Sequence, residues 1–336
     1  MWRRHAAGAA LLMGLVLHVP ALAAPTPKRE LAPLRTARTA LVKFDNSPFP
    51  YRGEVPEKGK QFLDVVEGER LGHYSIRAAT TYWEDQTYSD RRVLLHIPRG
   101  FDPRLPALMI VFLHGNEARL MRDVRNRQQV PRQVSESGLN AVLVVPQFAV
   151  NALDSSAGRF WEPGVFAQFV REAGERLTEL YGDERARSAF HDAPLVLAAY
   201  SGGYHPAAFI LQRGRVEDRV RGLILLDSPF GDLEKFADWL AGRPPAFLIS
   251  AFGKSARDDN TLLQRMLAER GVPYQSGLPA ELARGSVAFI DGSDDLKHVD
   301  FVTDAWVRDP LKVILRRIKG FPRDGGSTPG SPAKKK

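Results

Sequence analysis

A serine followed by two glycines is the most chemically suggestive feature of this sequence. Ser201 comes directly after the apolar segment 194–200, and Gly202, Gly203 and a helix-forming stretch follow it. A sharp turn from strand to helix needs small residues, and it exposes the serine hydroxyl beside free backbone N–H groups. Such a hydroxyl is a candidate nucleophile. Because the chain contains no cysteine, a nucleophilic enzyme built from it must use a hydroxyl, an amine or a carboxylate.

Apolar runs alternating with amphipathic stretches predict the elements that position this serine. Continuous apolar runs are typical of parallel strands buried on both faces, and they occur at 92–97, 107–113, 141–145, 194–199, 222–226, 246–251 and 286–290. Helices are predicted at about 120–137, 163–181, 204–213, 232–241 and 260–270. This alternation predicts an α/β fold, with a doubly wound, mostly parallel sheet and helices on both faces. Such sheets place their chemistry at the carboxyl ends of the strands.

The segment around Ser201 resembles the nucleophile elbow of the α/β-hydrolase superfamily. The match is Ala199-Tyr200-Ser201-Gly202-Gly203, with Ala199 where the family pattern usually has glycine. That change replaces one small residue with another, which the turn tolerates. The resemblance covers about residues 91–318 and implies the α/β-hydrolase fold with a small lid or none.

A second motif supports this resemblance at the end of the strand 107–113. The segment Phe112-Leu113-His114-Gly115-Asn116 is similar to the His-Gly segment that follows the family's third strand. In that family the residue after His-Gly donates a backbone N–H group to the oxyanion. The resemblance therefore implies an oxyanion hole formed by the N–H groups of Asn116 and Gly202. His114 itself is expected to be a structural hydrogen-bonding residue.

The resemblance also implies a general base and an acid. His298 follows the last predicted strand, where the superfamily keeps its catalytic histidine. The acid usually follows the family's seventh strand, and there Asp258 or Asp259 could serve. Asp227 lies directly at the end of strand 222–226, a position that some hydrolases of this fold use. We prefer Asp227 because strand ends are held more rigidly than loops, although each aspartate could instead cap a helix.

Two aromatic residues are candidates for contact with a substrate. Trp161 lies in the segment 151–164 after a predicted strand, where it could overhang the pocket or pack against the following helix. Tyr200 adjoins Ser201. Only residues 150–163 and 228–245 provide material for a lid.

The positive charge of the chain is concentrated at its two ends. The formal charge is +8, of which Arg3 and Arg4 supply two and the tail from Lys319 to Lys336 supplies four. The remainder is close to neutral, and basic residues do not interleave with aromatic ones, so no nucleic-acid partner is expected. The basic tail is expected to be a disordered, solubilising end, or else to make weak contact with an anionic envelope surface.

The N-terminal residues predict an export signal. Arg3 and Arg4 precede an apolar stretch at 6–19, and Pro20 comes before the small-residue cleavage pattern 21–23. We therefore expect an exported protein, periplasmic or secreted, with both the Sec and the twin-arginine routes open. The predicted organisation is a signal peptide at 1–24, an extended lead-in at 25–59, the hydrolase domain at 60–319 and a disordered tail at 320–336.

The function expected from these residues is serine hydrolysis of an ester or related acyl bond through an acyl-enzyme. No zinc motif and no phosphate-binding glycine loop occurs in the sequence, so no cofactor or metal is expected. Two alternatives stay open. One is an inactive scaffold that binds an envelope component or a carbohydrate, which Ala199 and the ambiguous acid would suit. The other is an acyltransferase.

Overall fold

The computed structural model describes residue 2, residues 31–242 and residues 246–323. The predicted signal peptide, apart from residue 2, and most of the basic tail lie outside these residues. Within them, no helix combines the length and apolar character needed to cross a bilayer.

A nine-stranded sheet forms the centre of the domain, in the order β1-β7-β9-β8-β10-β11-β12-β14-β13. Its strands are β1 (Arg38–Lys43), β7 (Arg92–Ile97), β8 (Leu108–Leu113), β9 (Ala141–Pro146), β10 (Leu195–Tyr200), β11 (Val220–Leu226), β12 (Phe247–Phe252), β13 (Gln275–Ser276) and β14 (Val287–Asp291). The strands from β9 to β13 in this order run parallel, whereas β7 near one edge is antiparallel to both of its neighbours, β1 and β9. The mostly parallel, doubly wound sheet is confirmed.

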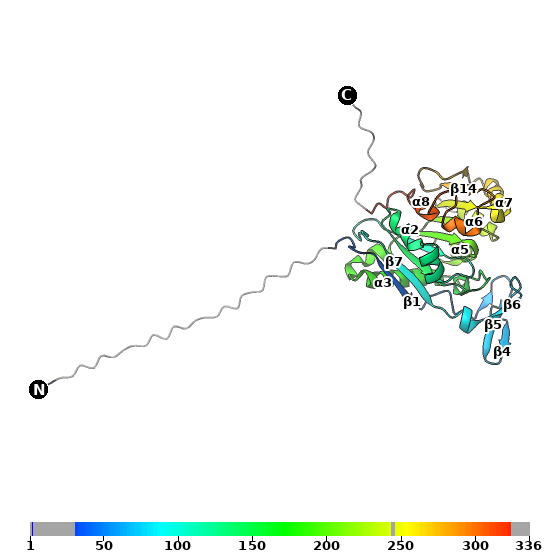
Figure 1. Cartoon of the computed structure of the whole chain (residues 1–336), viewed down its shortest axis with the longest axis horizontal. Coiled ribbons are helices and arrows are strands. Elements are labelled where there is room, and N and C mark those ends of the chain that lie inside the picture. Colours follow the sequence, from blue (N-terminus) through cyan, green and yellow to red (C-terminus); the bar gives the residue numbers. More distant parts are fainter. Residues whose placement is uncertain (1, 3–30, 243–245, 324–336) are drawn as a thin grey trace, which may run out of the picture. The chain divides into compact units, whose positions relative to one another are not determined.

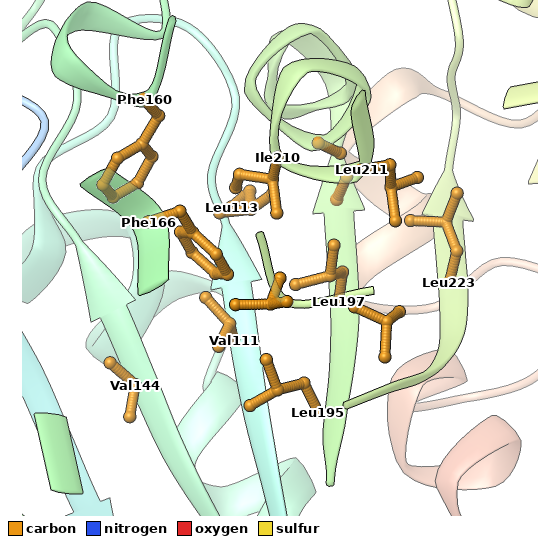
Figure 2. Close-up of a cluster of buried hydrophobic side chains, with 14 of the residues drawn as sticks. Val111, Leu113, Val144, Phe160, Phe166, Leu195, Leu197, Ile210, Leu211 and Leu223 are labelled. Atoms are coloured by element: carbon orange, nitrogen blue, oxygen red, sulfur yellow. The ribbon is translucent and has the colours of Figure 1, made fainter. Parts of the chain in front are cut away.

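Alternate residues of each central strand point into two separate hydrophobic cores. In β10, Leu195, Leu197 and Ala199 join one core, whereas Val196, Ala198 and Tyr200 join the other, as the period of two in a strand requires. The first core lies under α3 (Val165–Tyr181), α5 (Tyr204–Arg213), α6 (Leu233–Gly242) and α7 (Arg257–Glu269). Figure 2 shows part of it, with the apolar side chains of β8 and β10 beside Ile210 of α5.

The second core is covered by shorter helical segments. They are the π-helix η1 (Leu120–Arg127), α2 (Val130–Glu136), the 3₁₀ segment η6 (His298–Val302) and α8 (Pro310–Leu315). The remaining short segments are α1 (Glu84–Thr87), η2 (Gly158–Trp161), η3 (Glu184–Ala186), α4 (Arg187–His191), η4 (Ser201–Gly203) and η5 (Lys254–Ala256). Both faces of the sheet are therefore covered, as predicted.

The helix expected at 120–137 is divided in two. The π-helix η1 ends at Arg127, and α2 begins at Val130 after Gln129, which has a positive φ of 51°. Pro131 is the reason for the break. Proline has no backbone N–H and is tolerated in the first turn of a helix but not in its interior, so a new helix starts beside it.

The described part of the expected lead-in, residues 31–59, contributes to the nine-stranded sheet and its first core. Its strand β1 pairs with β7 along all six residues. Phe44 and Phe49 are fully buried in the first core. The sheet and its core therefore begin before the boundary expected at residue 60.

Two small sheets follow β1 in the chain. One pairs β2 (Glu54–Val55) with β3 (Lys60–Gln61), and the other contains β4 (Val65–Glu67), β5 (Arg70–Ser75) and β6 (Thr80–Trp83), labelled in Figure 1. These strands are short and mix polar with apolar residues, so no continuous apolar run in the sequence predicts them.

The first residues of the expected tail are also held by the domain. Phe321 is buried, and the guanidinium of Arg323 donates hydrogen bonds to the carbonyl oxygens of Ser135 and Leu139. Residues 320–323 therefore differ from the disordered tail that the sequence predicted.

Candidate active site

Ser201 lies at a sharp turn between β10 and α5. Its φ is 53°, in the left-handed region that residues other than glycine rarely adopt. A Cβ at Gly203 would overlap the backbone carbonyl of Leu113 in β8, so only glycine lets the helix approach the sheet this closely. A Cβ at Gly115 would lie 2.7 Å from the Cβ of Ser201. The turn is thus the strained strand-to-helix connection that a nucleophilic serine requires.

The carboxylate of Asp227 is hydrogen-bonded to the imidazole of His298. Asp227 follows β11, is 1% exposed and has a φ of 43°. Its Oδ1 accepts the backbone N–H of Gly253 at 2.8 Å, and its Oδ2 accepts the hydroxyl of Ser255 at 3.2 Å. The same Oδ2 lies 2.5 Å from Nδ1 of His298. With Nδ1–H directed at the carboxylate, Nε2 is the ring nitrogen available for proton transfer.

The other two candidate acids lie in the first turn of α7. Asp258 is exposed and Asp259 is half-buried. Burial, together with the negative charge of Asp258, raises the pKa of Asp259. The structure therefore brings Asp227 to the imidazole and places the two alternatives on a helix terminus.

Ser201 and His298 line the same cavity, which has a volume of about 450 Å³. His298 begins η6, and its ring stacks on the ring of Tyr200 with centroids 4.9 Å apart. Tyr200, a candidate for contact with substrate, is buried, and its ring faces the imidazole of His298.

The two segments expected to form an oxyanion hole lie against each other. Asn116 follows β8, and its Oδ1 accepts the hydroxyl of Ser155 at 3.0 Å. A Cβ at Gly202 would overlap this same Oδ1. The side chain of Asn116 therefore lies against Gly202, the residue after Ser201.

His114 holds the loop that carries Asn116. Its Nδ1 donates to the carbonyl of Gly115 at 2.8 Å, and its Nε2 accepts the backbone N–H of Phe148 at 3.0 Å. Complete burial lowers the pKa of His114 to about 4, so the imidazole is neutral at ordinary pH. These bonds agree with the structural role expected for His114.

A second, larger cavity of about 520 Å³ adjoins the first, and both are lined by Arg77, Ser155 and Tyr204. Trp161 lines the larger cavity, and its indole Nε1–H donates to Nε2 of His205 at 3.2 Å. The side chain of Trp161 is thus at the pocket wall, and it is also largely buried.

Several residues of these walls carry no sequence signal that points to a pocket. The imidazole of His205 is held through Nδ1 by the carboxylate of Asp232 at 2.7 Å, and both residues line the larger cavity. Another part of this wall comes from β5 and the turn after it, at residues 73–77. No sequence signal links that turn to Ser201, because the two are joined only by the folding of the chain.

The sheet order and the turn at Ser201 are those of an α/β-hydrolase fold, as the sequence motifs predicted. The sequence matches no protein-family model and no curated protein. Among solved structures, the chain is similar to a feruloyl esterase module from Clostridium thermocellum, with a TM-score of 0.43 and 12% identity over 80% of this chain and 95% of that chain.

Two further solved structures show a comparable likeness. An S-formylglutathione hydrolase from Agrobacterium tumefaciens has a TM-score of 0.40 and 12% identity, covering 75% of this chain and 97% of that chain. An esterase from Pyrobaculum calidifontis has a TM-score of 0.39 and 14% identity, covering 67% of this chain and 80% of that chain.

Proposed function

We propose that this protein is a serine hydrolase that cleaves an ester or related acyl bond through an acyl-enzyme. One observation carries the proposal. The buried carboxylate of Asp227 is bonded to His298, and the imidazole lines the same cavity as the strained Ser201. A nucleophile, a base and a group that orients the base are the parts that acyl transfer by serine requires.

The proposed reaction begins when Oγ of Ser201 attacks the substrate carbonyl carbon and its proton passes to Nε2 of His298. Asp227 stabilises the imidazolium through Nδ1–H. The carbonyl oxygen becomes an oxyanion that accepts the N–H groups of Gly202 and Asn116, and each donor contributes roughly 3 to 4 kcal/mol to transition-state stabilisation.

Collapse of this intermediate breaks the bond to the leaving alcohol, which takes its proton from His298. An acyl group is left on Ser201. Water then attacks the acyl-enzyme while His298 accepts its proton, and release of the acid restores the serine. No step requires a metal or an organic cofactor.

A fluorophosphonate probe tests the proposed nucleophile directly. The wild-type chain should form a covalent adduct, and Ser201→Ala should form none while retaining its circular dichroism spectrum. Ser89→Ala is a matched control because Ser89 is exposed and its hydroxyl donates to the local carbonyl of Asp85, away from both cavities. A folded wild-type protein that remains unlabelled would favour a binding scaffold. Product analysis with and without an added alcohol separates hydrolysis from acyl transfer.

We also propose export of the protein from the cytoplasm, which rests on the N-terminal sequence alone. Mass spectrometry of protein recovered from the periplasm or the medium should show a chain that begins near residue 25. A full-length cytoplasmic product would contradict this proposal.

A further inference from the structure

Among the residues that the structure describes, Arg77 is the one Arg, Lys, Asp or Glu that lines the cavity of Ser201 and His298. It also lines the larger cavity next to it. Its side chain is exposed, and within the described residues no carboxylate forms an ion pair with it. A free guanidinium is thus placed where the cavity of the proposed nucleophile meets its neighbour.

The turn that carries Arg77 is anchored to the cavity wall. Ser75, at the end of β5, accepts the backbone N–H of Ala78 through its hydroxyl at 3.2 Å and donates that hydroxyl to the carbonyl of Leu153 at 3.5 Å. The phenol of Tyr82 in β6 accepts the backbone N–H of Leu153 at 3.1 Å. Leu153 also lines the larger cavity, so Arg77 projects from a turn whose base is tied to the wall.

The carboxylates of the larger cavity are already bonded within the protein. Asp232 is held by His205 and by the ammonium of Lys235 at 2.9 Å, which also lies 3.5 Å from Glu57. Asp154 accepts the phenol of Tyr88 at 2.7 Å. Asp232 and Glu57 thus share the ammonium of Lys235, whereas Asp154 is held by a neutral phenol and keeps its charge.

The remaining acid of this cavity, Asp64, accepts the backbone N–H of Tyr74 at 2.9 Å. Two further cations, Lys58 and Lys60, line the larger cavity, and within the described residues they have no ion-pair partner. Lys58, Lys60 and Arg77 are thus cations without an ion pair among the described residues, in a wall that also carries carboxylates.

We propose that Arg77 selects esters that carry a negatively charged substituent, such as a carboxylate, near the scissile bond. Guanidinium binds a carboxylate through two parallel hydrogen bonds, and such charge-assisted bonds are stronger than neutral ones. The substituent extends from the cavity of Ser201 toward Arg77, which lies where the two cavities meet. This substrate class rests on the proposed function.

The test compares esters matched in length but different in charge. Mono-4-nitrophenyl adipate places a carboxylate on the acyl side, and 4-nitrophenyl hexanoate is its neutral counterpart. On the leaving-group side, 4-acetoxybenzoate is compared with its methyl ester. In at least one of the two pairs, the wild type should prefer the anionic ester. For that pair, Arg77→Gln should lower kcat/KM for the anionic ester by about tenfold, mainly through KM, and should leave kcat/KM for the neutral ester unchanged.

Two variants control this measurement. Arg77→Lys keeps the charge and should retain most of the preference. Arg70→Gln removes an arginine of the same small sheet that pairs with Asp85 and does not line either cavity, so it should change neither ester. The preference of the wild type should also weaken as salt is added.

The outcomes separate this inference from the proposed function. If the wild type hydrolyses the esters but Arg77→Gln changes the anionic and neutral members of both pairs equally, the role of Arg77 is wrong and the hydrolase proposal stands. If a folded wild type hydrolyses none of the esters and is not labelled by the fluorophosphonate, the hydrolase proposal itself fails.

Discussion

The Nδ1 atom of His298 lies 2.5 Å from Oδ2 of Asp227, a contact between residues 71 positions apart in the chain. Asp227 is held by the end of β11 and by the N–H of Gly253 after β12, whereas His298 follows β14. Because β11, β12 and β14 are consecutive parallel strands in the sheet, their carboxyl ends meet at one edge.

This contact predicts that Asp227→Asn will lower kcat by roughly three to four orders of magnitude with little change in KM, because an amide neither fixes the imidazole tautomer nor stabilises the imidazolium. Asp258→Asn is the matched control and should leave turnover nearly unchanged. Steady-state kinetics on a neutral ester measures both. A large loss in Asp258→Asn with none in Asp227→Asn would overturn the assignment of the acid.

The close approach of the elbow to β8 predicts a large cost for a methyl group at Gly203. A Cβ there would overlap the backbone carbonyl of Leu113, and backbone in a buried strand cannot move aside cheaply. Gly203→Ala should reduce the free energy of unfolding by about 2 kcal/mol or more. Gly242→Ala, at the end of α6 with open space around it, should be close to neutral. Urea denaturation of the two variants checks this, and equal stabilities would contradict it.

The buried imidazole of His96 predicts a loss of stability in mild acid. His96 bonds the hydroxyls of Thr39 and Ser135 at 2.7 Å each. Burial, with the positive charges of Arg323 and Arg125, lowers its pKa from 6.5 to about 4. Between these values the unfolded chain binds more protons than the folded one. The neutral imidazole of His96 therefore makes its full contribution to the free energy of unfolding above about pH 6.5, and this contribution is lost as the pH falls toward 4.

Near the middle of this range, the free energy of unfolding should fall by up to about 1.4 kcal/mol per pH unit for each such histidine. His114, whose pKa is also lowered to about 4 by burial, makes the free energy of unfolding fall more steeply with pH in this range. Urea denaturation at about pH 7 and about pH 5 measures it. His96→Gln should be less stable at neutral pH but should show a smaller slope. An unchanged slope would mean that His96 does not titrate in this range.

Local pattern in the sequence predicted the central elements well. The continuous apolar run at 107–113 became β8 at Leu108–Leu113, and the run at 194–199 became β10 at Leu195–Tyr200. Such runs identify strands because both faces of a parallel sheet are buried. The turn at Ser201 was also predictable, since the need for small residues there is a local requirement.

Tertiary structure alone decided which groups meet. The sequence offered Asp227, Asp258 and Asp259 as acids, and the convergence of strand ends brought Asp227 to His298. The folding of the chain also brought the turn at Arg77 to the cavity of Ser201, although the sequence of β5 and β6 carries no pattern that links this turn to Ser201. Periodicity reports which face of an element is buried, whereas contacts between distant segments depend on the packing of the whole sheet and its connections.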